Sequence, residues 1–146
     1  MSDLKCVVVA ILLALLATSD FVLAQAPRPP AQAVESSVWI TRIEPPISVT
    51  LTPGSTVQFL VEAEYTLADA NGRLALFIQG AEPENARIAA DVKPITRGSN
   101  KVSFVVDVKI PPTRHVDVIT ALYSGSNGPT QVTDSRVFEV HRVQEK

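Results

Sequence analysis

Apolar and polar residues alternate with a period of two along most of the chain after Glu35. Successive side chains of a β-strand point to opposite faces of a sheet, so the alternation predicts strands with one apolar and one mostly polar face. The clearest cases are residues 56–65 and 101–110. Five weaker segments complete a set of seven predicted strands, at residues 38–43, 73–79, 87–93, 116–123 and 136–143.

Turn-forming residues separate the predicted strands. Glycine and asparagine accept the left-handed backbone that turns require, and proline fixes a bend. Such residues gather at 52–55, 69–72, 97–100, 111–113 and 124–129. Many short strands with regular turns and no helical period indicate a β-sandwich or a small barrel.

Two motifs are similar to those of a known class of β-domain. In bacterial immunoglobulin-like and fibronectin type III-like domains a PG-x-x-V turn introduces the second strand, which resembles Pro45-Pro46 followed by Leu51-Thr52-Pro53-Gly54-Ser55-Thr56-Val57-Gln58-Phe59. Ala121-Leu122-Tyr123 and the loop after it resemble the penultimate strand of those domains. The resemblance covers residues 38–143 and implies a single antiparallel, seven-stranded immunoglobulin-like or fibronectin type III-like β-sandwich. Unlike antibody domains, the chain lacks both core cysteines, and its only tryptophan, Trp39, lies on the first predicted strand rather than the third.

The amino-terminal residues predict a signal peptide at 1–24. Lys5 precedes an apolar run at residues 6–17, which is shorter than the roughly 20 residues that a membrane-spanning helix needs. Small residues then place cleavage after Ala24, with Ala26 as the alternative, and an uncleaved anchor is the competing interpretation. The short leader with its alanine-rich end is typical of bacteria. It predicts a periplasmic or secreted protein with no membrane insertion after cleavage.

A proline- and alanine-rich linker is predicted at residues 25–34, and one β-sandwich domain at 35–146. Cleavage after Ala24 removes the only cysteine, so we expect no disulfide. It also removes one basic residue of 13 and two acidic residues of 15, which leaves 12 against 13 and a net charge near −1. This balance, without a basic stripe, argues against nucleic acid and against anionic lipid surfaces as partners.

The sequence offers little catalytic chemistry. His115 and His141 are predicted to be ordinary surface residues, and no nucleophile-elbow, metalloprotease or phosphate-binding motif is present. Glu62 and Glu64 project from one face of one strand, where solvated carboxylates are common. Two separated histidines rarely form a zinc site, and no loop has the spacing of an EF-hand. We therefore predict no enzyme, no metal and no cofactor.

An apolar spot on a strand face is the most suggestive candidate contact. If residues 56–65 pair with 101–110 so that Glu64 lies opposite Lys101, then Leu60 falls opposite Val105. Leu60 and Val105 are the two residues that break the polar alternation of their strands. Together they predict a small contact face, although isolated surface apolar residues are also common.

The sequence favours an exported, non-enzymatic protein-interaction or structural module of the cell envelope or secretome, with an unidentified protein partner. The alternative is a small ligand binder, for glycans, or a protease inhibitor that acts through its loops. Candidate loop contacts are Asp69, Asn71, Tyr123 and Asn127. Tyr123 is the aromatic residue expected to be most exposed, and most of the other aromatic residues of the predicted strands are expected in the core.

Overall fold

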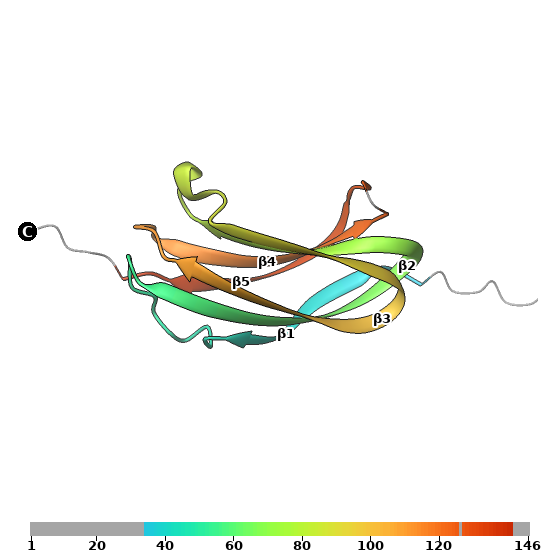
Figure 1. Cartoon of the computed structure of the whole chain (residues 1–146), viewed down its shortest axis with the longest axis horizontal. Coiled ribbons are helices and arrows are strands. Elements are labelled where there is room, and N and C mark those ends of the chain that lie inside the picture. The colour runs from blue at the N-terminus through green and yellow to red at the C-terminus, as the bar shows by residue number, and fades with distance from the viewer. Residues whose placement is uncertain (1–33, 126, 142–146) are drawn as a thin grey trace, which may run out of the picture. The chain divides into compact units, whose positions relative to one another are not determined.

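The computed structural model describes residues 34–125 and 127–141, so the predicted signal peptide and nearly all of the predicted linker lie outside it. Five strands form one antiparallel sheet (Figure 1). They are β1 (Ser37–Glu44), β2 (Thr56–Gly80), β3 (Ala89–Lys109), β4 (His115–Ser124) and β5 (Thr130–Glu139), with a short 3-10 helix, η1 (Pro83–Asn85), after β2.

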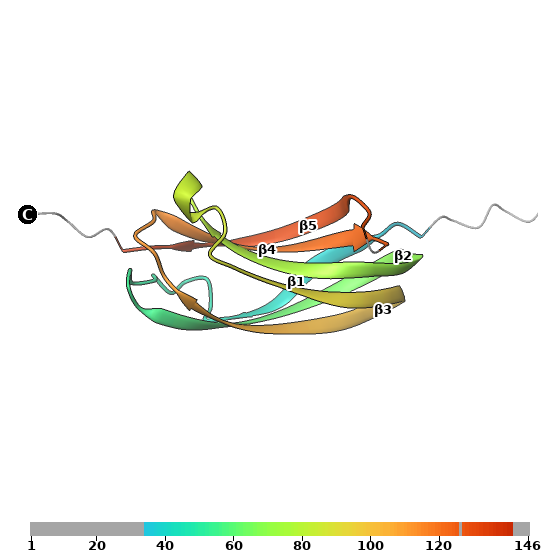
Figure 2. The same ribbon diagram turned by 45° about the horizontal axis from the view of Figure 1, so that its top comes forward.

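The length of β2 determines the topology. Its first half pairs with β1 and its second half with β4, while β3 pairs with β2 along almost its whole length. The order of the main path is β1-β2-β4-β5. Figure 2 shows how β2 and β3 curve together, so that one continuous sheet curls into a half-barrel whose two halves face each other.

The prediction of seven strands in a two-sheet sandwich is wrong. Predicted strands 56–65 and 73–79 are the two halves of β2, and 87–93 and 101–110 are the two halves of β3. The predicted turns at 69–72 and 97–100 are bends inside these strands. Pairing continues across the bend, from Leu67 opposite Gly98 to Asn71 opposite Thr96, with a register shift between them. The resemblance to immunoglobulin-like and fibronectin type III-like domains therefore does not give the fold.

These turns were predicted wrongly because the same types of residue occur both in turns and in β-bulges. Gly98 has a φ of +111°, a conformation that other residues rarely adopt, and it lies where β3 bends. A bulge increases the local bend and twist without ending the strand pair. Glycine, asparagine and aspartate thus mark the place where the chain changes direction, but they do not show whether the hydrogen-bonded ladder ends there.

Strand β5 begins at Thr130, six residues before the predicted start at Arg136. The prediction began the strand too late because its inward side chains include the charged residues Asp134 and Arg136, which interrupt the apolar alternation. These two residues fasten β5 to β1, with which it has no strand pairing among the described residues. The backbone N–H of Ile40 donates to Asp134 Oδ2 at 2.7 Å, and Arg136 Nη2 donates to the Ile40 carbonyl at 3.1 Å. Ile40 lies at a register shift in β1, so side chains of β5 satisfy backbone groups there.

The core fills the space between the two halves of the curled sheet. Phe59 from the first half meets Phe138 of β5 edge to face, with ring centroids 5.3 Å apart. The largest fully buried side chains come from both halves and from the segments that close the ends: Phe59, Phe104, Phe138, Leu51, Leu67, Leu74, Leu76, Ile78, Ile110 and Leu122. The core thus holds the sheet curled and leaves each half with an outer face.

Candidate functional site

The predicted pairing around Leu60 is confirmed. Glu64 lies opposite Lys101 and Leu60 lies opposite Val105. The Lys101 ammonium is 2.7 Å from Glu64 Oε1. Val105 is 59% exposed, whereas Leu60 is partly buried. The register is therefore as expected, and the use of this spot as a contact face stays a prediction.

Charged side chains surround that spot. We define the charged face as the outer surface of β1, the first half of β2 and the second half of β3. Arg42 forms an ion pair with Glu44 and lies 3.6 Å from Glu62 Oε1. The hydrogen bond from Lys101 lowers the pKa of Glu64, against the opposing effect of burial. Glu62 and Glu64 thus belong to surface ion pairs, in agreement with the interpretation of both as solvated carboxylates.

On the other outer face, two complete rows of the sheet contain no charged residue, and the one guanidinium given against them is that of Arg87, which lies 5.6 Å from the centroid of the Phe77 ring. Strand pairing places Val92, Ala75, Ala121 and Thr133 in one row and Ala90, Phe77, Ile119 and Ser135 in the next. These eight residues define the uncharged face. Val92 is 47% exposed, and Val137, at its margin, is 53% exposed. Ala75 and Ala121 are buried but do not belong to the core cluster. Their short side chains lie on the outer surface between larger neighbours, which shield them from water.

Sequence reasoning missed this face. Leu74, Leu76 and Ile78 point into the core, so Ala75 and Phe77 between them point outward. A segment that is apolar on both faces gives no alternation from which the outer side chains can be recognised. Most aromatic residues of the strands lie in the core as expected, namely Phe59, Tyr65, Phe104 and Phe138. Phe77 is only partly buried, however, and Trp39, at 44%, is more exposed than Tyr123, which was expected to be the most exposed.

The predicted loop contacts partly converge. Asp69 accepts hydrogen bonds from the Ser124 hydroxyl and from Gln131 Nε2, the latter at 2.9 Å. The Gly125 N–H donates to the Asn71 carbonyl at 2.8 Å, which joins the bend of β2 to the end of β4. Asp69 and Asn71 line one hollow, and Tyr123 lies beside its lining residue Arg73. Asn127 is exposed in the turn beyond β4.

A second, smaller hollow lies beside Trp39 on the charged face. It has a volume of about 590 Å³, and Glu64, Thr66, Ser99, Asn100 and Lys101 line it with Trp39 and Tyr65. An exposed indole ring flanked by hydrogen-bonding side chains combines an apolar surface with polar groups at its rim. Sequence analysis placed Trp39 on the first predicted strand but gave no sign that its ring lies outside the core.

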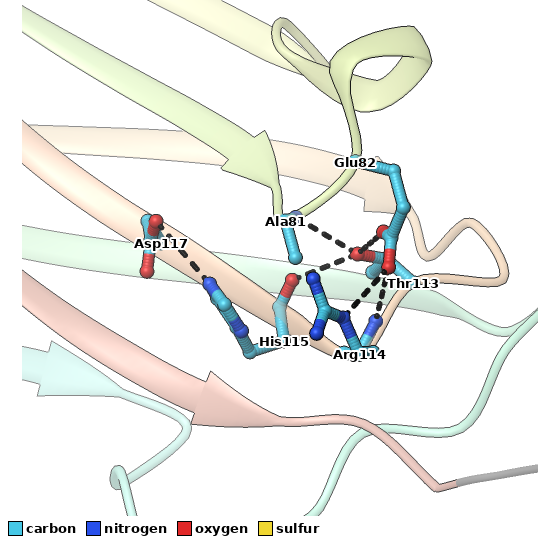
Figure 3. A network of polar contacts seen from close by, with 6 residues as sticks. All are labelled: Ala81, Glu82, Thr113, Arg114, His115 and Asp117. Atoms are coloured by element: carbon cyan, nitrogen blue, oxygen red, sulfur yellow. Dashed lines mark hydrogen bonds and ion pairs between the residues drawn. The ribbon is translucent and has the colours of Figure 1, made fainter.

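Figure 3 shows a polar network between the end of β2 and the loop before β4. The Thr113 hydroxyl donates to Glu82 and accepts a hydrogen bond of 2.9 Å from the Ala81 N–H. Arg114 contributes its backbone N–H and its Nε to Glu82 Oε1, both at 3.3 Å. The hydrogen bond from Thr113 lowers the pKa of Glu82, although burial opposes the shift.

This network fastens two loops and does not form a nucleophile. Thr113 is only 8% exposed, and its hydroxyl proton is already directed to Glu82. His115 Nε2 lies 3.7 Å from Asp117 Oδ2, beyond hydrogen-bonding distance. The contacts explain instead how the segment containing η1 is held against β4.

Within residues 34–125 and 127–141, no three histidine, cysteine, aspartate or glutamate side chains gather as a metal site would require. No helix of this part of the chain is long and apolar enough to cross a bilayer. The chain matches no protein-family model and no curated protein. A proposal about its function therefore rests on the surfaces described above.

Proposed function

We propose that this protein is an exported, non-enzymatic interaction module and that a protein partner covers its uncharged face. The observation that carries the proposal is the pair of adjacent rows without a charged residue across four strands, with Phe77 and Ile119 at the centre, Val92 at one side and the Arg87 guanidinium stacked on Phe77. The centre of a protein interface is depleted of charged residues and enriched in aromatic ones. A contiguous apolar patch on a soluble domain marks a contact site more often than isolated apolar residues do.

The contrast between the two outer faces supports this choice. Both faces belong to the same sheet and both carry exposed valines. The charged face places Val105 among the side chains of Glu44, Glu62 and Asp107, whereas the uncharged face places Val92 beside Ala75 and Ala121. Covering the uncharged face would remove apolar surface from water without stripping water from ion pairs.

Lysine substitutions on the uncharged face test the proposal. We expect Val92→Lys and Ala90→Lys each to weaken partner binding by at least about a hundredfold, because both sites are exposed in β3 on the uncharged face and burying an unpaired ammonium costs several kcal/mol. The full-length chain is expressed and the protein is purified. Wild type and variants are then compared, at equal concentration, for the amount of partner that each captures from an envelope extract of the source organism.

Val105→Lys is the matched control. It changes the net charge equally, and its site in β3 is exposed to a similar degree, but it lies on the charged face. The proposal expects a partner that Val105→Lys retains and the other two variants lose. Loss of the partner in Val105→Lys alone would contradict it and would favour the contact spot at Leu60 and Val105.

A second candidate function, glycan binding, is favoured by the hollow beside Trp39. The exposed indole offers a stacking surface, and Glu64, Asn100 and Lys101 offer hydrogen-bonding groups at the rim of the same hollow. This proposal needs neither the uncharged face nor the loops that the sequence favoured for ligand binding.

Tryptophan fluorescence tests the glycan proposal directly, because Trp39 is the only tryptophan of the chain. We expect a saturable change in emission when polysaccharide from the host envelope is added, and we expect Asn100→Ala to weaken it about tenfold through a lost hydrogen bond. Asn127→Ala, which removes an exposed asparagine elsewhere, should have no effect. An unchanged spectrum at saturating polysaccharide would rule out this site.

A further inference from the structure

A hollow of about 900 Å³ lies at the bend of the sheet, beside the uncharged face. Its volume is in the range of small-molecule sites. The bend of β2, the middle of β3 and the end of β4 supply its walls, which consist of Asp69, Ala70, Asn71, Gly72, Arg73, Pro94, Ile95, Thr96, Ser124 and Gly125. Small side chains leave the space open, so the charged groups in the wall decide what can bind there.

Arg73 is the cation of this hollow, and its position is fixed by stacking. The centre of its guanidinium lies 5.2 Å from the centroid of the Tyr123 ring. Its Nε is buried and has no hydrogen-bond partner among the described residues. Within the same part of the chain, the terminal nitrogens of Arg73 make no hydrogen bond and no ion pair either, and they are not buried. The guanidinium is therefore held in the wall of the hollow with no acceptor or counter-charge from the residues that the structure describes.

Asp69 shares the hollow but does not neutralise Arg73. Its carboxylate is occupied by the hydroxyl of Ser124 and by Gln131 Nε2. Those hydrogen bonds, led by the one from Ser124, lower the pKa of Asp69, with burial opposing them and Arg97 assisting. Asp69 thus remains ionised with its own partners, while Arg73 is left for a group that the described residues do not supply.

We infer that the hollow binds a carboxylate and that Arg73 is the residue that receives it. A guanidinium matches a carboxylate through two parallel hydrogen bonds, and stacking on an aromatic ring orients its plane for such a pair. The carboxylate can belong to a free organic acid or to the protein partner. In the second case the inference rests on the proposed function, because the hollow adjoins the uncharged face through the row that pairs Pro94, Arg73 and Tyr123.

The Nε–Hε resonance of Arg73 in a ¹⁵N–¹H spectrum tests the inference. Sodium acetate is exchanged for sodium chloride at constant ionic strength, in protein purified after expression of the full-length chain. We expect a saturable shift of the Arg73 resonance, which is identified by its absence in Arg73→Lys. In that variant the shifts of neighbouring backbone amides should require at least about tenfold more acetate, the loss that one charge-assisted hydrogen bond represents.

Arg87→Lys is the matched control, because Arg87 also stacks on an aromatic ring, at 5.6 Å from the Phe77 centroid, but does not line the hollow. It should bind acetate as the wild type does. Asp69→Asn should bind acetate about twofold to threefold more tightly, since it removes a like charge. A linear, unsaturable shift of Arg73, an equal shift of the Arg87 resonance, or abolished binding in Asp69→Asn would each overturn the inference.

The two sources of the carboxylate give different results. If the partner supplies it, Arg73→Lys weakens partner capture about tenfold or more while Val92→Lys does not change acetate binding. If a free acid is the ligand, Arg73→Lys changes acetate binding alone. If Arg73→Lys loses acetate binding but still captures the partner, the partner is not the source of the carboxylate. If the wild type binds acetate but captures no partner, only the proposed function is overturned.

Discussion

Replacing Gly72 with alanine is expected to lower the free energy of unfolding by about 3 kcal/mol. A Cβ at this position would lie 2.5 Å from the Tyr123 carbonyl oxygen and 2.9 Å from Leu67 Cδ2. The oxygen belongs to the backbone of β4, which is paired with β2 at this point. It cannot move away without pulling the two strands apart, so the contact must be relieved by distorting the bend.

Urea denaturation of wild type and variant measures this loss. Asn71→Ala is the control, since it changes the neighbouring residue of the same bend but its side chain is exposed. We expect it to cost less than about 0.5 kcal/mol. A Gly72→Ala variant as stable as the control would show that β2 and β4 do not approach each other as closely as the described bend requires.

Asp134→Ala is expected to lower the free energy of unfolding by about 2–3 kcal/mol, because it leaves the Ile40 N–H without an acceptor and Arg136 without its carboxylate partner. Asp134→Asn keeps an oxygen for Ile40 but loses the charge that pairs with Arg136, so its cost should be about half. Asp107→Ala is the control. Asp107 accepts one bond, of 2.9 Å, from Gln58 on the charged face, and its loss should cost less than about 0.5 kcal/mol.

The same residue predicts a pH dependence. Burial raises the pKa of Asp134, but hydrogen bonds from Arg136, from the Ile40 N–H and from the Ser135 N–H outweigh it and hold the pKa below its ordinary value of 3.8. A group with a lowered pKa stabilises the fold above its unfolded pKa, and this contribution is lost as the pH falls through the folded pKa. The unfolding free energy of Asp134→Asn should therefore fall less than that of the wild type between about pH 5 and pH 3. Parallel pH profiles would show that Asp134 does not fasten β5 to β1.

Much of the β-structure could be predicted because one face of each strand half is apolar. Alternation located the first half of β2 and the second half of β3, and the charge pair of Glu64 with Lys101 gave the correct register of these two halves. The other two halves, near residues 73–79 and 87–93, gave weaker patterns. The continuity of β2 and β3 through the bend could not be predicted. Residues 69–72 and 97–100 have the composition of turns, and only the ladder on both sides of Asn71 and Thr96 shows that pairing resumes at once.

The functional surfaces were harder to predict, for physical reasons that differ between them. Phe77 lies in a segment apolar on both sides, so its outward direction is invisible in the pattern. Asp134 and Arg136 point inward and interrupt the apolar alternation of β5, which hid the start of that strand. The convergence of Asp69 and Asn71 with the end of β4 was expected from loop clustering. Arg73 was missed, because its lack of a hydrogen-bond partner among the described residues is a property of the folded chain.

The hollow depends on one continuous sheet, in which β2 and β3 remain paired through their bend. Nuclear Overhauser effects between backbone protons test this most directly. We expect contacts between Leu67 and Gly98 on one side of the bend and between Asn71 and Thr96 on the other, together with contacts from Gly72 to both Ile95 and Ser124. If the contacts of Asn71 and Gly72 with β3 are absent while those between Leu67 and Gly98 are present, the strands end at the bend. The single curled sheet would then be contradicted, along with the hollow that its bend forms.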